Sequence, residues 1–308
     1  MDKIGFIGLG RMGRPMAGNL LRRDFDLVVH DLNQSAVDAL VALGAEAGTS
    51  VADVAARSDV IITMLPNSAI VSDIVVGPGG ILSAARAGSL VLDMSTVDAN
   101  TTDAIAASCR EKGVAFVDAP VGRLASHADA AQSLFMVGGE SADFERVKPM
   151  LEAMGSTIYH CGGPGAGTRT KIVNNFLAVA SCQMNAEALA LAQRFGLDLD
   201  STLDVLYGTT AFNGQLKIAW PTKSLVGDVE PGFTIDLAHK DLTLVMESAN
   251  AAKVPMPMAA AAREAFSSAR ARGFGGSDFS GMLLAQCDLV GIEPPQLSHN
   301  SRHKPPAA

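Results

Sequence analysis

The strongest constraint on the fold is an alternation of short apolar runs with Ala-rich stretches of helical periodicity in the first half of this 308-residue sequence. Strands that alternate with helices form parallel sheets, because each crossover helix packs back onto a face of the sheet. The sequence therefore predicts a doubly wound α/β sheet. The expected strands are KIGFIG (3–8), DLVVHD (26–31), DVIITML (59–65), SLVLDM (89–94), AFVDA (115–119), SLFMVGG (133–139) and TIYHC (157–161).

The pattern changes at GGPGAG, residues 162–167, where Gly, Pro and Ala interrupt the strand-like runs. Residues 168–195 have the periodicity of one long helix, and further helical patterns continue to about residue 293. We therefore predict an α/β domain at 1–163 and an all-helical domain at 164–294. The polar, Pro-rich residues 295–308 are expected to form a disordered tail.

Composition and charge exclude several classes of protein. The net charge of −8 disfavours long-range attraction to nucleic acid or to an acidic membrane. No apolar run approaches 18 residues, so no membrane span is expected. The four cysteines have no paired spacing, and no His/Cys/carboxylate cluster has the spacing of metal ligands. We expect a cytoplasmic protein without disulfides or a metal site.

A glycine-rich motif follows the first expected strand. Gly8, Gly10 and Gly13 have the G-x-G-x-x-G spacing at the opening of a helical pattern. In this context Gly8 allows a tight turn, Gly10 lets a pyrophosphate approach the backbone, and Gly13 lets helix and strand pack closely. The helix N-terminus offers N–H groups to the phosphates. The motif predicts dinucleotide binding.

Asp31 ends the second expected strand, 18 residues after Gly13. A carboxylate there accepts hydrogen bonds from the adenine ribose hydroxyls and repels a 2′-phosphate. No Arg follows in HDLNQS, so the sequence favours NAD over NADP, with NADH preferred to NADPH. The alternative interpretation is that Asp31 only caps the next helix.

One face of the long helix carries Lys171, Asn174 and Asn175, and Ala178 continues this face. A solvated stripe would explain the three polar residues, but such stripes usually carry several charges, and Asn is a poor helix former. The functional alternative is a general acid/base. A desolvated Lys171 would protonate a carbonyl oxygen as hydride arrives, and Asn175 would hold the lysine or the reacting oxygen.

Together these residues resemble the β-hydroxyacid dehydrogenase family, which includes 3-hydroxyisobutyrate dehydrogenase and tartronate semialdehyde reductase. The resemblance covers residues 3–294 and rests on four ordered motifs, FIGLGRMGRPMAGNLL (6–21), DAPV (118–121), GGPGAGTRTKIVNN (162–175) and HKDL (239–242). It implies a 6-phosphogluconate dehydrogenase-like fold, in which a Rossmann-like domain precedes an all-α domain for substrate binding and oligomerisation, with a cleft between them.

The resemblance also implies roles for individual residues. Lys171 would be the catalytic acid/base, with Asn175 beside it. The remaining implied positions bind the cofactor: Arg11 and Met12 at the pyrophosphate turn, Leu65, Pro66 and Thr96 on the nicotinamide side, and Lys240 closing over it from the helical domain.

The chain departs from the commoner family pattern after DAPV, where Ser-Gly-Gly is replaced by Gly122, Arg123 and Leu124. An arginine offers a planar, permanently charged fork that suits an oxyanion with several oxygens, such as a sulfonate. The PVGR sequence resembles that of the sulfolactaldehyde reductases of this family, as do WPTK (220–223) and IDLAHKDL (235–242). Gly122, Arg123 and Asn174 would then hold the sulfonate, and Ala178 would face the same pocket.

Three functional hypotheses follow. The first is an NADH-dependent reductase of a small anionic aldehyde, 3-sulfolactaldehyde, which forms 2,3-dihydroxypropane-1-sulfonate. The second is a reductase of a carboxylate semialdehyde of the succinic semialdehyde or 3-hydroxyisobutyrate type, because Arg also binds carboxylates. The third is a non-catalytic dinucleotide-binding scaffold, against which the presence of Lys171 and Asn175 argues. Arg123 has a structural alternative as well, an ion pair with Asp118 or Asp129. The resemblance implies a homodimer or homotetramer.

Overall fold

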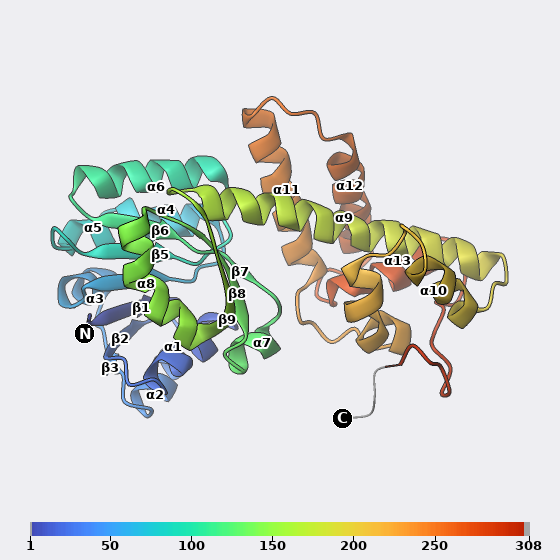
Figure 1. The fold of residues 1–308 in the computed structure, drawn as a ribbon, viewed down its shortest axis with the longest axis horizontal. Coiled ribbons are helices and arrows are strands. Elements are labelled where there is room, and N and C mark those ends of the chain that lie inside the picture. The colour runs from blue at the N-terminus through green and yellow to red at the C-terminus, as the bar shows by residue number, and fades with distance from the viewer. Residues whose placement is uncertain (1, 305–308) are drawn as a thin grey trace. The chain divides into compact units, whose positions relative to one another are not determined.

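The computed structural model describes residues 2–304, and the chain divides into two compact units after Ile172 (Figure 1). The first unit is an α/β sheet and the second consists of helices, so the predicted fold class is confirmed. No helix among the described residues has the length and apolar character needed to cross a membrane.

The first unit is built on a nine-stranded sheet with the order β3-β2-β1-β4-β5-β6-β8-β7, and β9 pairs with β8. The strands from β3 to β6 are parallel, whereas β8 is antiparallel to β6 and β7. All seven predicted strands are present. The strands are β1 (Ile4–Ile7), β2 (Leu27–His30), β3 (Glu46–Ala47), β4 (Val60–Thr63), β5 (Leu90–Asp93), β6 (Ala115–Asp118), β7 (Val121–Gly122), β8 (Ser133–Gly138) and β9 (Gly155–Gly162).

Helices cover both faces of this sheet, as its apolar strands require. In β1, Ile4 and Phe6 join the core on the side of α1 and α8, whereas Ile7 joins the core on the side of α3, α4 and α6. The same alternation recurs in β4 and β5, so each face buries every second residue. The helices are α1 (Gly13–Leu21), α2 (Gln34–Val41), α3 (Val51–Arg57), α4 (Ser68–Val76), α5 (Ile81–Ala84), α6 (Ala99–Glu111), α7 (Ala125–Asp129) and α8 (Ser141–Met154).

A long helix, α9 (Ala166–Arg194), begins in the first unit and continues into the second. It agrees with the single helix predicted at 168–195. The second unit packs its helices around a core that includes the fully buried Trp220 and Phe266. The remaining helices are α10 (Leu199–Tyr207), α11 (Ile235–Ala251), α12 (Pro257–Ala271) and α13 (Met282–Leu289), with short helical turns at Gln215–Ala219, Trp220–Thr222, Ser224–Val226 and Phe279–Gly281.

The segment from residue 295 to residue 304 differs from the disordered tail expected for 295–308. Leu297 is buried in the helical core, and its N–H donates to the Leu225 oxygen at 2.8 Å. The Ser301 hydroxyl donates to Asp200 at 2.5 Å, and the His303 ring packs edge-on against Tyr207. The buried Pro295 and Leu297 and these polar contacts order a stretch whose composition alone favours disorder. Residues 305–308 lie outside the described residues.

Candidate active site

The glycine loop between β1 and α1 has the geometry that the motif predicted. Gly8 has a φ of 98°, and a Cβ added there would lie 2.3 Å from the Met64 oxygen. A Cβ on Gly13 would lie 1.9 Å from the Gly8 oxygen. Around Gly10, by contrast, no atom lies within 4 Å of an added Cβ, so the loop keeps open space where a pyrophosphate would approach. The residues present therefore fit a dinucleotide.

Asp31 is oriented toward this loop from the end of β2. One carboxylate oxygen accepts from the Leu9 N–H at 2.6 Å and the other accepts from the Asn33 N–H at 2.7 Å. The N-cap of α2 is Asn33, whose side chain accepts from the Ser35 N–H. Asp31 thus lies beside the glycine loop and does not cap the helix. Within the glycine loop, Arg11 is exposed, and Met12 lies at the N-cap position of α1.

The loops after β4 and β5 are tied to each other. The Leu65 N–H donates to the Ser95 hydroxyl at 2.9 Å, and the Ser95 N–H donates to Asp93 at 3.1 Å. Asp93 is 2% exposed, and its burial raises the pKa of the carboxyl group. Since parallel strands end at one edge of a sheet, the half-buried Leu65, the exposed Pro66 and the half-buried Thr96 share the edge that carries the glycine loop.

Lys171 reaches β7, the strand that ends at Gly122 and directly precedes Arg123. Its Nζ donates to the main-chain oxygen of Val121 at 2.8 Å. Gly122 is buried in β7, where a Cβ would lie 3.2 Å from the Leu134 side chain. The structure thus brings together a lysine and a strand that lie about 50 positions apart in the sequence.

The position of Lys171 depends on Asp118, a role that the sequence did not reveal. Asp118 is 1% exposed at the end of β6, and its two carboxylate oxygens accept from the Gly165 and Thr168 N–H groups, both at 2.6 Å. Burial raises the pKa of this carboxyl group, and the two main-chain donors oppose that rise. Asp118 therefore caps the N-terminus of α9 and fixes where the helix starts. A buried acid at the end of an apolar strand was the available signal.

Asn175 lies one turn after Lys171 on α9 and is held by Asp241 of α11. The Asn175 Nδ2 donates to Asp241 Oδ2 at 2.6 Å, and the other oxygen of Asp241 lies 3.0 Å from the Lys240 ammonium. Asn174 is exposed and donates to the Asn175 Oδ1 at 3.1 Å. Asp241, which the sequence reading did not single out, fixes the amide of Asn175 and pairs with Lys240. Ala178 is half-buried on α9.

Arg123 has an unusual backbone and an extended set of contacts. Its φ is 73°, a conformation that favours glycine. Its Nη1 donates to the Gln132 main-chain oxygen at 2.6 Å and to the Ser156 hydroxyl at 2.9 Å, and its Nη2 donates to the Thr157 hydroxyl at 3.1 Å. All three acceptors that the described residues provide are neutral. The structure therefore does not contain the ion pair with Asp118 or Asp129 that the sequence left open as an alternative.

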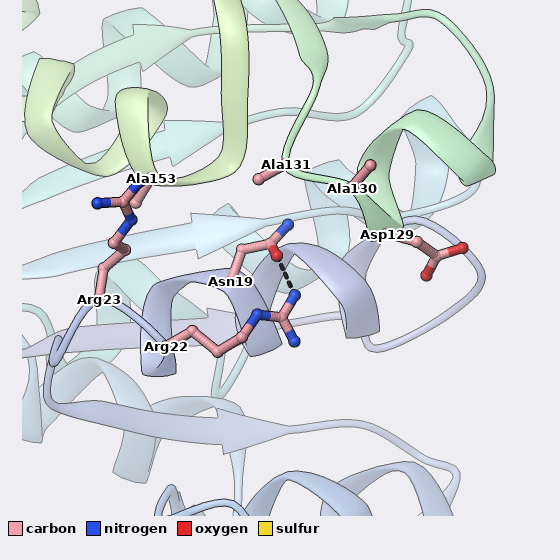
Figure 2. Close-up of a pocket in the computed structure, with 7 residues that line it drawn as sticks. All are labelled: Asn19, Arg22, Arg23, Asp129, Ala130, Ala131 and Ala153. Atoms are coloured by element: carbon pink, nitrogen blue, oxygen red, sulfur yellow. Dashed lines mark hydrogen bonds between the residues drawn. The ribbon is translucent and has the colours of Figure 1, made fainter.

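A separate hollow of about 400 Å³ lies near the C-terminal end of α1, whereas the glycine loop precedes the N-terminus of this helix (Figure 2). The Asn19 amide donates to the Ala128 oxygen at 2.7 Å, and Arg22 donates to the oxygen of that amide. These contacts tie α1 to α7. None of the residues predicted to bind substrate or cofactor lines this hollow, which is lined by Asn19, Arg22, Arg23, Asp129, Ala130, Ala131 and Ala153.

Comparison with known families agrees with this geometry. Residues 3–163 match the family model described as the NAD binding domain of 6-phosphogluconate dehydrogenase, and residues 165–285 match that described as NAD-binding of NADP-dependent 3-hydroxyisobutyrate dehydrogenase. The chain belongs to the β-hydroxyacid dehydrogenase family. It is an oxidoreductase that binds a nicotinamide dinucleotide and acts on CH–OH groups.

Several family members are similar over nearly the whole chain. The 3-sulfolactaldehyde reductase of Escherichia coli (strain K12) is 43% identical over 283 residues, which cover 92% of this chain and 95% of that protein. The 2-(hydroxymethyl)glutarate dehydrogenase of Eubacterium barkeri is 40% identical, with 94% and 96% covered. Among solved structures, that of Mycobacterium tuberculosis 3-hydroxyisobutyrate dehydrogenase with L-serine superposes with a TM-score of 0.85. The two sequences are 32% identical, and the match covers 92% of this chain and 99% of that chain.

Proposed function

We propose that this family member is an NADH-dependent reductase of 3-sulfolactaldehyde, which forms 2,3-dihydroxypropane-1-sulfonate in a reversible reaction. The observation that carries the proposal is the position of Arg123, a guanidinium without a carboxylate partner among the described residues. It directly follows β7, the strand whose Val121 oxygen accepts from Lys171. The 43% identity to a 3-sulfolactaldehyde reductase supports the same assignment.

The proposed chemistry uses Lys171 as general acid and Arg123 as anion anchor. A bound reduced nicotinamide supplies a hydride to the aldehyde carbon. Lys171 donates a proton to the carbonyl oxygen, whose developing charge its ammonium stabilises. Asn175 positions the lysine or the reacting oxygen, while Arg123, Asn174 and the Gly122 backbone hold the sulfonate. The reverse reaction returns the hydroxyl proton to Lys171.

The preference for NADH rests on Asp31. Its carboxylate is fixed beside the glycine loop by the Leu9 and Asn33 N–H groups, where it accepts from ribose hydroxyls and repels a 2′-phosphate. The residues that follow, Leu32, Asn33 and Gln34, offer no cation to such a phosphate.

A carboxylate semialdehyde is the second candidate substrate, because Arg pairs well with carboxylates. The 40% identical relative is named for a hydroxy-dicarboxylate, and another relative of 38% identity is the NAD-dependent L-serine dehydrogenase of Pseudomonas aeruginosa. The two hypotheses differ in the anion that Arg123 binds. A sulfonate is tetrahedral and offers three acceptor oxygens, whereas a carboxylate is planar and offers two.

The deciding experiment follows NADH absorbance with 3-sulfolactaldehyde, succinic semialdehyde and methylmalonate semialdehyde. We expect 3-sulfolactaldehyde to have at least a hundredfold higher kcat/KM, or about 2.7 kcal/mol in transition-state binding. An equal or higher value for a carboxylate aldehyde would assign the enzyme to the semialdehyde group. If the enzyme turned over none of the three aldehydes, all three would be excluded as its substrate.

We also propose that the protein is a cytoplasmic homodimer or homotetramer. The exposed apolar residues Val173, Leu177, Met184 and Leu191 recur along α9 at helical spacing, and the exposed Phe195 directly follows the helix. Such a stripe is typical of a face that packs against another helix. All four cysteines are unpaired, as suits a reducing compartment. Light scattering of the purified protein measures the mass directly, and a monomer at micromolar concentration would contradict the assembly.

A further inference from the structure

The side chain of Arg123 is fixed at its far end by groups that leave its charge in place. Its three acceptors are the Gln132 main-chain oxygen and the hydroxyls of Ser156 and Thr157, at 2.6, 2.9 and 3.1 Å. A carboxylate in the same place would hold the guanidinium equally well but would neutralise it. Neutral acceptors orient the cation and keep it available to an anion.

The donors of the guanidinium can be counted. An arginine has five N–H donors in one rigid plane. Both hydrogens of Nη1 are used, by Gln132 and Ser156, and one hydrogen of Nη2 is used by Thr157. One Nη2–H and the Nε–H remain without an acceptor among residues 2–304. Because the group is planar, fixing Nη1 and Nη2 also fixes the direction of these two donors.

The backbone contributes to the same arrangement. Arg123 follows β7 with a φ of 73°, a conformation that side chains other than glycine rarely adopt. Strained backbone of this kind persists where the surroundings impose it, and it often marks a functional turn. Ser156 and Thr157 lie at the start of β9, and Thr157 pairs in register with Leu134 of β8, which pairs with Gly122 of β7. The sheet thus sets the distance between Arg123 and its two hydroxyl acceptors.

We propose that Ser156 and Thr157 are positioning residues that set the specificity of the enzyme for a sulfonate. They hold the Arg123 guanidinium so that the Nε–H and the remaining Nη2–H form a two-point contact with two sulfonate oxygens. Without the hydroxyls, a flexible arginine must be ordered each time the substrate binds, which weakens binding of the anionic group alone. This inference rests on the proposed function, because it assumes that the sulfonate of the substrate reaches Arg123.

The test is the double variant Ser156→Ala/Thr157→Val, which removes both hydroxyls and nearly keeps the side-chain volumes. Glyceraldehyde serves as a neutral comparison substrate, because it carries a hydroxyl where 3-sulfolactaldehyde carries the sulfonate. We expect kcat/KM for 3-sulfolactaldehyde to fall about tenfold, mainly through KM, and that for glyceraldehyde to stay within twofold. The control is Ser108→Ala, which removes an exposed hydroxyl of α6 that bonds within its own helix.

The same substitutions in an Arg123→Ala background provide a second readout. If the hydroxyls act only through the guanidinium, they have no further effect once it is absent. Equal losses for both aldehydes, or a further loss in the Arg123→Ala background, would show a structural role and overturn the inference. Unchanged discrimination in the double variant would overturn it too. If the wild-type enzyme does not discriminate between the two aldehydes, the proposed function itself fails.

Discussion

The ammonium of Lys171 donates to the main-chain oxygen of Val121 at 2.8 Å, so that a side chain of α9 is tied to the strand that leads into Gly122 and Arg123. A lysine ammonium has three donors, and the carbonyl takes one of them. The contact fixes the position of the ammonium relative to the turn, which is the requirement for a proton donor that acts on a substrate held by that turn.

Replacement of Lys171 by Met keeps the length of the side chain and removes the proposed proton donor. We expect kcat to fall by about 10²–10⁴, the usual contribution of general acid catalysis, with NADH binding unchanged. Stopped-flow absorbance measures the turnover rate, and quenching of protein fluorescence by NADH measures the binding of NADH. Lys148→Met, on the surface of α8, is the matched control. Unchanged turnover in Lys171→Met would eliminate this residue as the acid.

Replacement of Asp31 by Ser removes the carboxylate beside the glycine loop. We expect the KM for NADH to rise about tenfold or more, because hydrogen bonds to a charged group are lost, and the preference over NADPH to shrink. Steady-state kinetics with both cofactors give the ratio. Asp38→Ser, which removes an exposed carboxylate of α2, should leave that ratio as it is. An undiminished preference for NADH in Asp31→Ser would mean that another group rejects the 2′-phosphate.

The backbone strain at Arg123 can be measured by comparing two truncations. Arg123→Gly and Arg123→Ala both remove the guanidinium contacts, but only Ala keeps a Cβ at a φ of 73°. We expect the Gly variant to have a free energy of unfolding about 1 kcal/mol higher than the Ala variant, as determined by urea denaturation. A more stable Ala variant would indicate that the turn relaxes out of the left-handed conformation.

The cap formed by Asp118 should be a major contributor to stability. Asp118→Ala leaves the buried N–H groups of Gly165 and Thr168 without their acceptor, and we expect a loss of about 3 kcal/mol in urea denaturation. The control is Asp103→Ala, which breaks an exposed ion pair with Arg169 and should cost less than about 1 kcal/mol. Similar losses in the two variants would show that α9 starts independently of β6.

The sequence predicted the parts of the fold that depend on local patterns. All seven expected strands and the long helix appear, because apolar runs and helical periodicity recur within short windows. The strands β3 and β7 were not predicted. Each is two residues long, and a strand of that length shows no detectable period of alternating apolar residues. The order at 295–304 was not predicted either, because it depends on the buried Pro295 and Leu297 and on polar partners about a hundred residues away.

Within the candidate site, the predictable features were likewise local. The glycine spacing and the i, i+4 relation of Lys171 and Asn175 can be read along the chain. The partners of these residues cannot be read in this way, because they lie far away in the sequence. Asp118 is 47 and 50 positions from Gly165 and Thr168, and Asp241 is 66 positions from Asn175. The contacts of Arg123 with Ser156 and Thr157 require the register of β7, β8 and β9, which no local pattern specifies.

The cap at the start of α9 has a consequence for how such enzymes can be recombined. The two family models meet between residues 163 and 165, and that junction looks like a natural place to exchange one catalytic half for another. A cut there would leave Asp118 buried without its partners Gly165 and Thr168. A transplantable sheet unit therefore has to include Thr168, and the compact unit itself ends at Ile172, so Lys171 travels with it. The proposed proton donor is then inherited with the sheet, and a chimera can exchange the helical half and keep Lys171.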